Sequence, residues 1–184
     1  KNILKIFSKP MFMYPLSAAK KVKQIDKIYV SSDSGYILKQ AKKNGCIPIN
    51  RPKYLCNDKA LLEEAIQHAV NYCQNINSNK ITNFIILLCN SICVRSADIE
   101  EGLKILKKTK KIDTVTTVSK FNNFSPVRAK KIVGQKLLNY IPNKNLKKFT
   151  PLSCDRDKSV HSYYCTQSFT RSRAKVLKNM KKNP

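Results

Sequence analysis

The feature that most constrains the fold of this chain is an alternation of short apolar runs with segments of helical periodicity. A β-branched and aromatic run at residues 27–33 is followed by a helix-like segment at 34–44, and a second short run at 46–49 is followed by a helix-like segment at 59–73. Strands that alternate with helices in this way predict right-handed crossovers and a mostly parallel sheet. The ligand site of such a sheet lies at the carboxyl ends of its strands.

The second half of the alternation predicts the middle of the sheet. The most apolar stretch of the chain, residues 84–88, indicates a central parallel strand that is covered on both faces. Ser96 is expected to cap the next helix, and residues 114–118 return to a strand. Beyond Phe121 the alternation of strand-like and helix-like segments stops, and lysine-rich loops and an aromatic stretch follow. We therefore expect one α/β domain over residues 1–184.

Three loops of this domain are candidates for a site, those that follow Val30, Leu88 and Val118. Asn57 and Asp58 are expected to open the helix at 59–73, since both residue types are good helix caps. His68 lies off the apolar face of that helix and is expected to be solvated, without a catalytic role.

Composition narrows the class of protein. With 184 residues, of which 42% are hydrophobic, the chain can bury one sizeable core. It contains no long apolar run and no secretory leader, which predicts a soluble, cytoplasmic protein without a membrane partner. The seven cysteines are an odd number without a C-x-x-C pair, so reduced thiols are favoured over a disulfide framework or a zinc site.

The net charge of +25 suggests a polyanionic partner when it is taken alone. However, only six of the 36 basic residues are arginines, which are the preferred readers of phosphates and guanines, and the lysines are spread over nearly every segment. A solvated lysine surface therefore explains the charge better than a nucleic-acid stripe. An RNA-binding or ribosome-associated protein stays open as an alternative because Tyr163, Tyr164 and Phe169 lie among basic residues.

Motif patterns give the chemistry. There is no Walker loop, G-x-G-x-x-G pattern or nucleophile elbow. Instead, five segments resemble, in order, motifs of acylneuraminate cytidylyltransferases. The motifs are K-N-I at Lys1, V-I-V-S-T-D at Ile28, R-P-x-x-L-A-x-D at Arg51, L-L-Q-P-T-S-P-L-R-T at Leu87 and S-V-V-S-V at Val115. Several matches in register carry the resemblance, which covers residues 1–132 well and 155–180 loosely.

The resemblance implies a Rossmann-like nucleotidyltransferase (GT-A-like) fold with a mostly parallel central sheet flanked by helices. It implies that CTP and a nonulosonic, sialic-acid-like sugar acid react to give the CMP-sugar and pyrophosphate, with Mg²⁺ as the cofactor and a homodimer as the possible assembly. Alternatives on the same fold are a 2-keto-3-deoxy-octonate (KDO) cytidylyltransferase and a sugar-phosphate uridylyltransferase.

The resemblance also assigns residues. Lys1 and Asn2 would contact the triphosphate and the cytidine, and Arg51 the cytosine or ribose. The family's Gln-Pro-Thr becomes Cys89, Asn90 and Ser91, which would bind the sugar substrate together with Arg95. For Arg95 a salt bridge to Asp98 is the competing interpretation.

Other acidic residues are expected to be structural. Asp33 and Asp58 match family positions, but the simplest role of each is to cap the following helix. Asp155 and Asp157 could bind Mg²⁺ as a pair, yet a loop cluster with Arg156 is preferred, so the metal ligands are not expected in this chain. Because the family's R-x-G-S-K loop would precede Lys1, we expect the chain as given to be incomplete at both ends and inactive or nearly so.

Overall fold

A computed structural model of the chain describes residues 2–78, 81–121, 125–146, 148–149, 161–174 and 177. The chain divides into two compact units, one formed by residues 1–116 with 167–184 and the other by residues 117–166. Two strands, β6 (Thr114–Lys120) and β9 (Tyr163–Arg173), contain the points at which the chain passes between the units. Lys1, Asp155, Arg156 and Asp157 lie outside the described residues.

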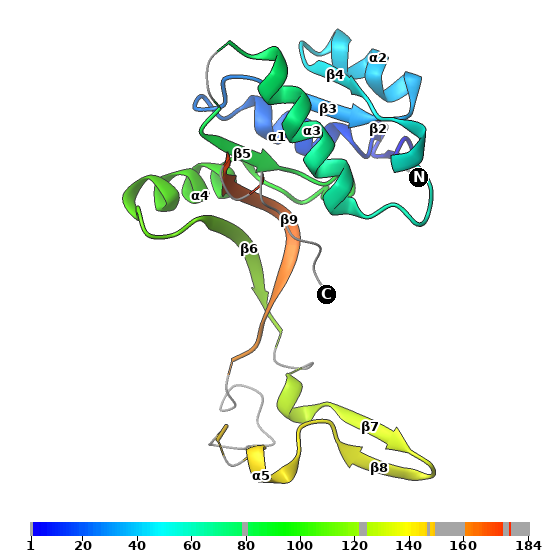
Figure 1. Ribbon diagram of the computed structural model, residues 1–184, viewed down its shortest axis with the longest axis vertical. Helices are drawn as coiled ribbons and strands as arrows, with labels where there is room; N and C mark the ends of the chain where they lie inside the picture. The colour runs from blue at the N-terminus through cyan, green and yellow to red at the C-terminus, as the bar shows by residue number, and fades with distance from the viewer. Residues whose placement is uncertain are drawn as a thin grey trace. The chain divides into compact units, whose positions relative to one another are not determined.

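The first unit contains a parallel β-α-β motif made of β3 (Tyr29–Ser32), α2 (Gly35–Lys43) and β4 (Ile47–Asn50), in which α2 lies against both strands (Figure 1). Ser34 begins the helix, because its hydroxyl accepts a hydrogen bond from the Ile37 N–H at 3.5 Å. The helix ends at Lys43, and Gly45 follows its cap residue with a φ of +71°, the left-handed conformation that favours glycine. The expected strands and helix are confirmed.

Helix α1 (Met13–Lys20) lies between two apolar clusters and joins them into the core of this unit. Leu16 packs with Ala41 and Cys46 beneath the β-α-β motif. On its other side, Ala18 packs with Val94 and Ile99. The helix is preceded by a short antiparallel pair, β1 (Lys5–Ile6) and β2 (Lys9–Pro10).

Strand β5 (Asn83–Ile86) differs from the expectation in its partner and its position. Its hydrogen-bonded neighbour is β9, which runs antiparallel to it, and the strand order is β5-β9-β6. The expectation of a parallel strand in the middle of its sheet was therefore wrong. The reason is that residues 170–173, which are distant in sequence, insert beside β5.

The starts of two helices also differ from the expectation. Helix α3 (Leu62–Ile76) begins after Leu61 rather than at Asn57 and Asp58, which lie in a turn that follows the short 3₁₀ helix η1 (Lys53–Leu55). Helix α4 (Ser96–Lys108) has Arg95 rather than Ser96 as its cap residue, because the Asp98 carboxylate accepts a hydrogen bond from the Arg95 N–H at 3.3 Å. In both cases an acid in the first turn stabilises the start of the helix.

The second unit contains a hairpin that the sequence patterns did not predict. Strands β7 (Lys130–Val133) and β8 (Lys136–Asn139) pair antiparallel around a turn at Gly134, whose φ is +60°. The 3₁₀ helix η3 (Pro126–Arg128) precedes the hairpin and the single-turn helix α5 (Asn143–Leu146) follows it. Every β7 side chain is exposed, so the hairpin buries no core of its own among the described residues.

The cysteines of the described residues differ in their exposure. The six that the structure describes are free, and two of them, Cys46 and Cys73, are buried. Burial raises the pKa of the Cys73 thiol to about 11. These side chains therefore pack as small apolar groups.

Candidate functional site

Arg51 lies directly after β4, at the carboxyl end of the parallel strand pair. Its N–H extends the ladder by donating to the Ser32 carbonyl at 3.0 Å. Its guanidinium group donates to the Ser31 carbonyl at 2.9 Å and to the Ser31 hydroxyl at 3.4 Å. No carboxylate among the described residues forms an ion pair with it. Arg51 is thus a half-buried cation that is oriented by neutral acceptors and still has donors available for an anionic or polar ligand.

Cys89 lies within electrostatic reach of Arg51. Burial raises the pKa of the Cys89 thiol, and the nearby Arg51 charge opposes this rise only in part. The thiol is therefore protonated at neutral pH. Cys89 opens the turn after β5, in which the Ser91 N–H donates to the Leu88 carbonyl at 3.0 Å and the Ile92 N–H to the Asn90 carbonyl at 3.1 Å. The charge of Arg51 thus acts on the first residue of the Cys89–Ser91 turn.

Asn2 is held against the start of α1. Its carbonyl accepts a hydrogen bond from the Phe12 N–H at 3.2 Å, and the neighbouring Leu4 carbonyl accepts one from the Met11 N–H at 2.9 Å. Phe12 itself is buried. The backbone at Asn2 is therefore fixed to the core of the first unit.

Arg95 occupies a different environment from Arg51. Two of its guanidinium nitrogens donate to the Asp98 carboxylate, at 2.6 and 3.0 Å, while 76% of its side-chain surface remains exposed. Hydrogen bonding and charge from Arg95 lower the pKa of Asp98, and Asp98 in turn raises the pKa of Arg95. The salt bridge that competed with a substrate role is therefore present.

Two acidic residues do not have the expected capping role. The cap of α2 is Ser34 rather than Asp33, and Asp58 lies ahead of the start of α3. His68 also differs from the expectation, because its Nδ1 atom is buried and has no hydrogen-bond partner among the described residues. His161 lies edge-on to Tyr163, and its Nε2 atom lies 3.3 Å from the Lys120 ammonium group.

Ser31 is the residue of this site that the sequence patterns missed. It lies in β3, where its pairing partner in β4 is Ile49. Arg51 is two residues further along the chain than this partner. Its carbonyl and hydroxyl both accept from the Arg51 side chain. Only the register of the two parallel strands brings the two residues together.

Neither a metal site nor a membrane span is found in the part of the chain that the structure describes. No three side chains of His, Cys, Asp or Glu come close enough there to hold a metal ion. None of the described helices has the length and apolar character needed to cross a bilayer.

Comparison with known proteins connects this geometry to a family. A family model described as cytidylyltransferase matches residues 1–133. A Helicobacter pylori protein named pseudaminic acid cytidylyltransferase and UDP-2,4-diacetamido-2,4,6-trideoxy-beta-L-altropyranose hydrolase is 30% identical over 133 residues, which are 70% of this chain and 24% of that protein. An Escherichia coli N-acylneuraminate cytidylyltransferase is 29% identical over 127 residues, or 69% of this chain and 29% of that protein. The chain thus spans about a quarter of the length of these relatives.

Solved structures support the same fold. The structure of CMP:2-keto-3-deoxy-manno-octonic acid synthetase complexed with CTP superposes with a TM-score of 0.65 at 16% identity, covering 97% of this chain and 69% of that one. A 4-diphosphocytidyl-2C-methyl-D-erythritol synthase superposes with a TM-score of 0.59 at 12% identity, covering 98% and 75%. These similarities confirm the expected Rossmann-like nucleotidyltransferase fold. With the family model matching most of its length, the chain belongs to the cytidylyltransferase family.

Proposed function

We propose that this protein is a cytidylyltransferase that activates a nonulosonic, sialic-acid-like sugar acid with CTP, giving the CMP-sugar and pyrophosphate. The observation that carries the proposal is Arg51, a half-buried cation without an acidic partner among the described residues, fixed by Ser31 at the carboxyl end of the parallel strands. This is where α/β folds of this kind bind their ligands.

In this reaction the anomeric hydroxyl of the sugar attacks the α-phosphorus of CTP, its proton is lost, and the bond from that phosphorus to the bridging oxygen of pyrophosphate breaks. Such a reaction needs alignment and neutralisation of charge more than covalent participation of the protein. Arg51 would donate to the cytosine or ribose, with Asn2 and Lys1 on the nucleotide. Of these, Lys1 is assigned by resemblance alone.

Binding of the sugar acid is assigned to the turn after β5 and to Arg95. Asn90 can offer an amide and Ser91 a hydroxyl to a sugar carboxylate or hydroxyl, and the protonated Cys89 thiol is a weak donor. A thiol cannot offer both a donor and a carbonyl acceptor, as the glutamine of the resembling motif can. We therefore expect a different pattern of sugar substituents to be accepted.

Mg²⁺ is the cofactor that this chemistry implies, because it neutralises phosphate charge. The described residues do not offer a carboxylate cluster for it. No role in the proposal is therefore given to a metal ligand of this chain.

A homodimer is proposed on the basis of the hairpin in the second unit. Ile132 and Leu137 are directly opposite each other across β7 and β8, and their side chains are 78% and 67% exposed. A cross-strand apolar pair that is this exposed is typical of an interface. Light scattering should give a dimer mass for the protein and a monomer mass for the Ile132→Lys/Leu137→Lys variant, whereas Lys131→Gln should remain dimeric. A monomeric parent protein would refute this part of the proposal.

The test of the activity is release of pyrophosphate from CTP in the presence of Mg²⁺ and each of several sugar acids. N-acetylneuraminate and pseudaminate are the expected substrates. Turnover of 2-keto-3-deoxy-octonate alone would favour the alternative KDO-type enzyme. Turnover of UTP with a sugar phosphate would contradict the proposed specificity.

An RNA-binding protein is the alternative from a different class. Tyr163 and Tyr164 are 60% and 43% exposed, and Arg156, Lys158 and Arg171 flank them in the sequence. Tight binding of a single-stranded RNA that survives 150 mM salt, together with no preference for CTP, would support this alternative and refute the enzyme.

A further inference from the structure

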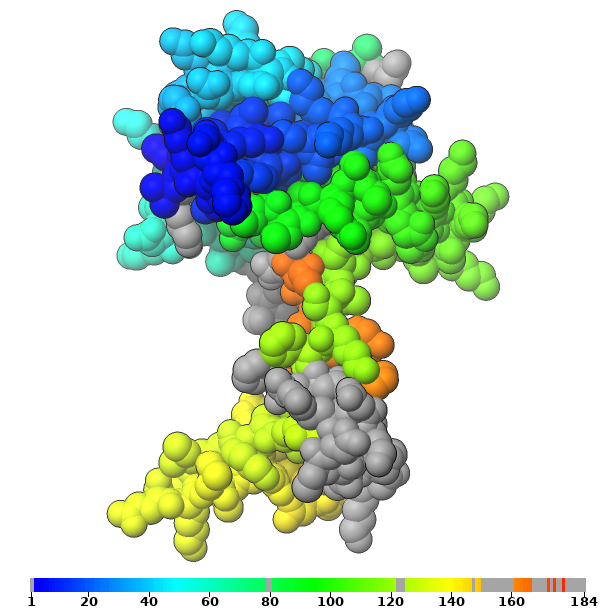
Figure 2. Space-filling view, turned by 180° about the vertical axis from the view of Figure 1, so that it is seen from behind, coloured from blue at the N-terminus to red at the C-terminus, as the bar shows by residue number. Residues whose placement is uncertain are grey.

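A hollow of about 330 Å³ lies between α1 and the segment that leads into α4. Three cationic side chains line it, Lys9, Lys21 and Arg95, together with the hydroxyl-bearing side chains Tyr14, Ser17 and Ser96. No carboxylate is among the described residues that line it. Figure 2 shows the N-terminal segment, in blue, adjoining the α4 segment, in green, on one face of the molecule.

Lys9 is fixed in this hollow by its surroundings. Its ammonium group donates to the Ser17 hydroxyl at 2.6 Å, and that hydroxyl donates to the Met13 carbonyl at 2.7 Å. Because the single Ser17 proton is used on Met13, the serine oxygen acts toward Lys9 as an acceptor. The same ammonium lies 5.0 Å from the centre of the Tyr14 ring, within the range of a cation–π contact. Two of its three N–H donors remain for another partner.

The balance of charge around the hollow is positive. The acid that reaches a lining cation is Asp98, which pairs with two nitrogens of Arg95 and leaves the third, Nη1, outside that pair. Lys21 extends from the end of α1 and is exposed. Three cations with one carboxylate between them repel one another, and a bound anion would offset this repulsion.

We propose that this hollow binds a small anion that carries a phosphate group. The hollow shares Arg95 with the proposed sugar site but is separate from the nucleotide contact at Arg51. A tetrahedral phosphate presents acceptors in several directions, which suits the ammonium of Lys9, the free edge of Arg95 and the hydroxyl of Ser96. The volume is that of a small-molecule site and leaves room for an organic group on the phosphate. Asn2, Arg51, Cys89, Asn90 and Ser91 do not line it.

The test is a residue-resolved NMR titration of the full chain, with ¹⁵N-labelled protein at about 150 mM salt, where nonspecific attraction to a basic surface is partly screened. Inorganic phosphate and glycerol phosphate are the two probes, and tighter binding of one of them identifies the source of the group. We expect saturable shifts of the Ser17 and Ser96 amide signals. These shifts should persist in Arg51→Ala, since the two sites are separate.

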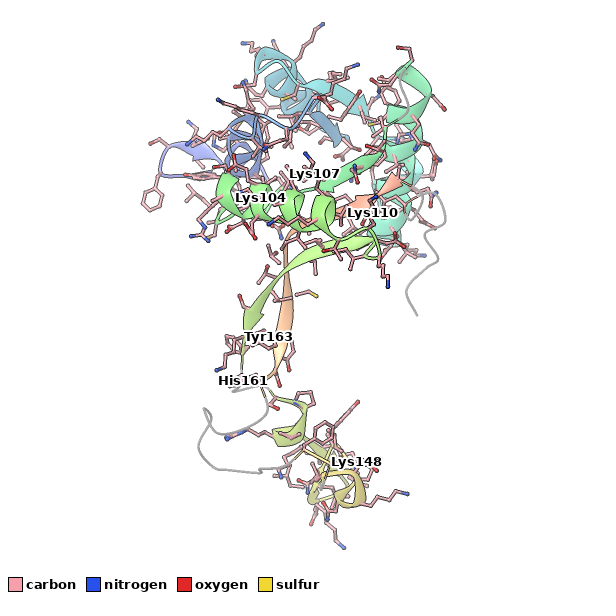
Figure 3. The ribbon with its side chains drawn as sticks, turned by 90° about the vertical axis from the view of Figure 1, so that its left-hand side faces the viewer. Lys104, Lys107, Lys110, Lys148, His161 and Tyr163 are labelled. Atoms are coloured by element: carbon pink, nitrogen blue, oxygen red, sulfur yellow. The ribbon has the colours of Figure 1, made fainter. Side chains whose placement is uncertain are left out.

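A charge-matched pair of variants separates a site from a basic surface. Lys9→Gln/Lys21→Gln should weaken phosphate binding at the Ser96 signal at least tenfold. Lys104→Gln/Lys107→Gln removes the same charge from two residues of α4 that Figure 3 labels and that do not line the hollow. This variant should change phosphate binding less than twofold. If Lys9→Gln unfolds the protein, judged by circular dichroism, the exposed Lys21→Gln alone should weaken binding at least threefold. Equal loss in both charge-matched variants, or no shift at Ser17 and Ser96 with either probe, would overturn the proposal.

Discussion

Replacing Arg51 by alanine is expected to weaken CTP binding while leaving the fold intact. The guanidinium group is held by two hydrogen bonds to Ser31, both to uncharged oxygens. A hydrogen bond from a charged group to a ligand contributes about 1.5–3 kcal/mol. The dissociation constant for CTP should therefore rise roughly 10- to 100-fold. Isothermal titration calorimetry with CTP measures this change directly.

The stability of the same variant should change little. The loss of the two hydrogen bonds to Ser31 is largely offset, because both oxygens of this half-buried contact can bind water instead. Arg51→Lys keeps the charge but loses the two-pronged geometry, so its affinity should lie between those of the parent and Arg51→Ala. Lys104→Gln, which removes an exposed charge on α4, is the control and should bind CTP within twofold of the parent. An Arg51→Ala protein that is folded and binds CTP within twofold of the parent would refute the assignment.

Three further predictions concern stability. Ile99 of α4 is fully buried and packs with Ala18 of α1. Its replacement by alanine should lower the free energy of unfolding by about 2–5 kcal/mol, measured by urea unfolding. Gly45→Ala should cost about 1 kcal/mol from backbone strain alone, because φ is +71° and a Cβ there would meet nothing within 4 Å. Burial raises the pKa of the Cys73 thiol from 9.0 to about 11, so the unfolded chain loses this proton at a lower pH than the folded protein does. The free energy of unfolding should therefore be constant below pH 9 and fall by ~2 kcal/mol as the pH rises toward 11. This fall should be absent in Cys73→Ala.

Local patterns were sufficient to predict the β-α-β motif of the first unit. Ser34 and Gly45 mark the two ends of α2, and both signals act within a few residues of the helix that they delimit. The family motif at Arg51 was likewise local. Its orientation by Ser31 was not predictable, since that contact depends on the register between two strands that are separated by a helix.

The sheet around β5 shows where local patterns fail. A continuous apolar run indicates burial but not the direction of the neighbouring strand. The partner strand, β9, is distant in sequence: Phe84 of β5 pairs with Ser172 of β9, more than 80 residues later. The buried Ser172 also hydrogen-bonds Thr114 of β6, at 3.1 Å. Such long-range pairing is set by tertiary packing, which a strand's own residues do not encode.

The hairpin was missed for a different reason. Gly134 and Gln135 form a two-residue connection, which is a usual hairpin signal. The two strands, with sequences Lys-Lys-Ile-Val and Lys-Leu-Leu-Asn, do not alternate between polar and apolar residues, so the pattern expected of a half-buried strand is absent. The start of α4 was misplaced by one residue because the Arg95–Asp98 pair, rather than the Ser96 hydroxyl, satisfies the first turn.

The most direct test of the central claim is a calorimetric titration of the protein with CTP and, separately, with ATP, both with Mg²⁺ and at about 150 mM salt. A basic surface attracts the two triphosphates equally, whereas a site that contacts the cytosine through Arg51 or Asn2 discriminates between the bases. The account predicts saturable binding of CTP that is at least tenfold tighter than that of ATP. Equal affinities that fall together as salt is raised would contradict it.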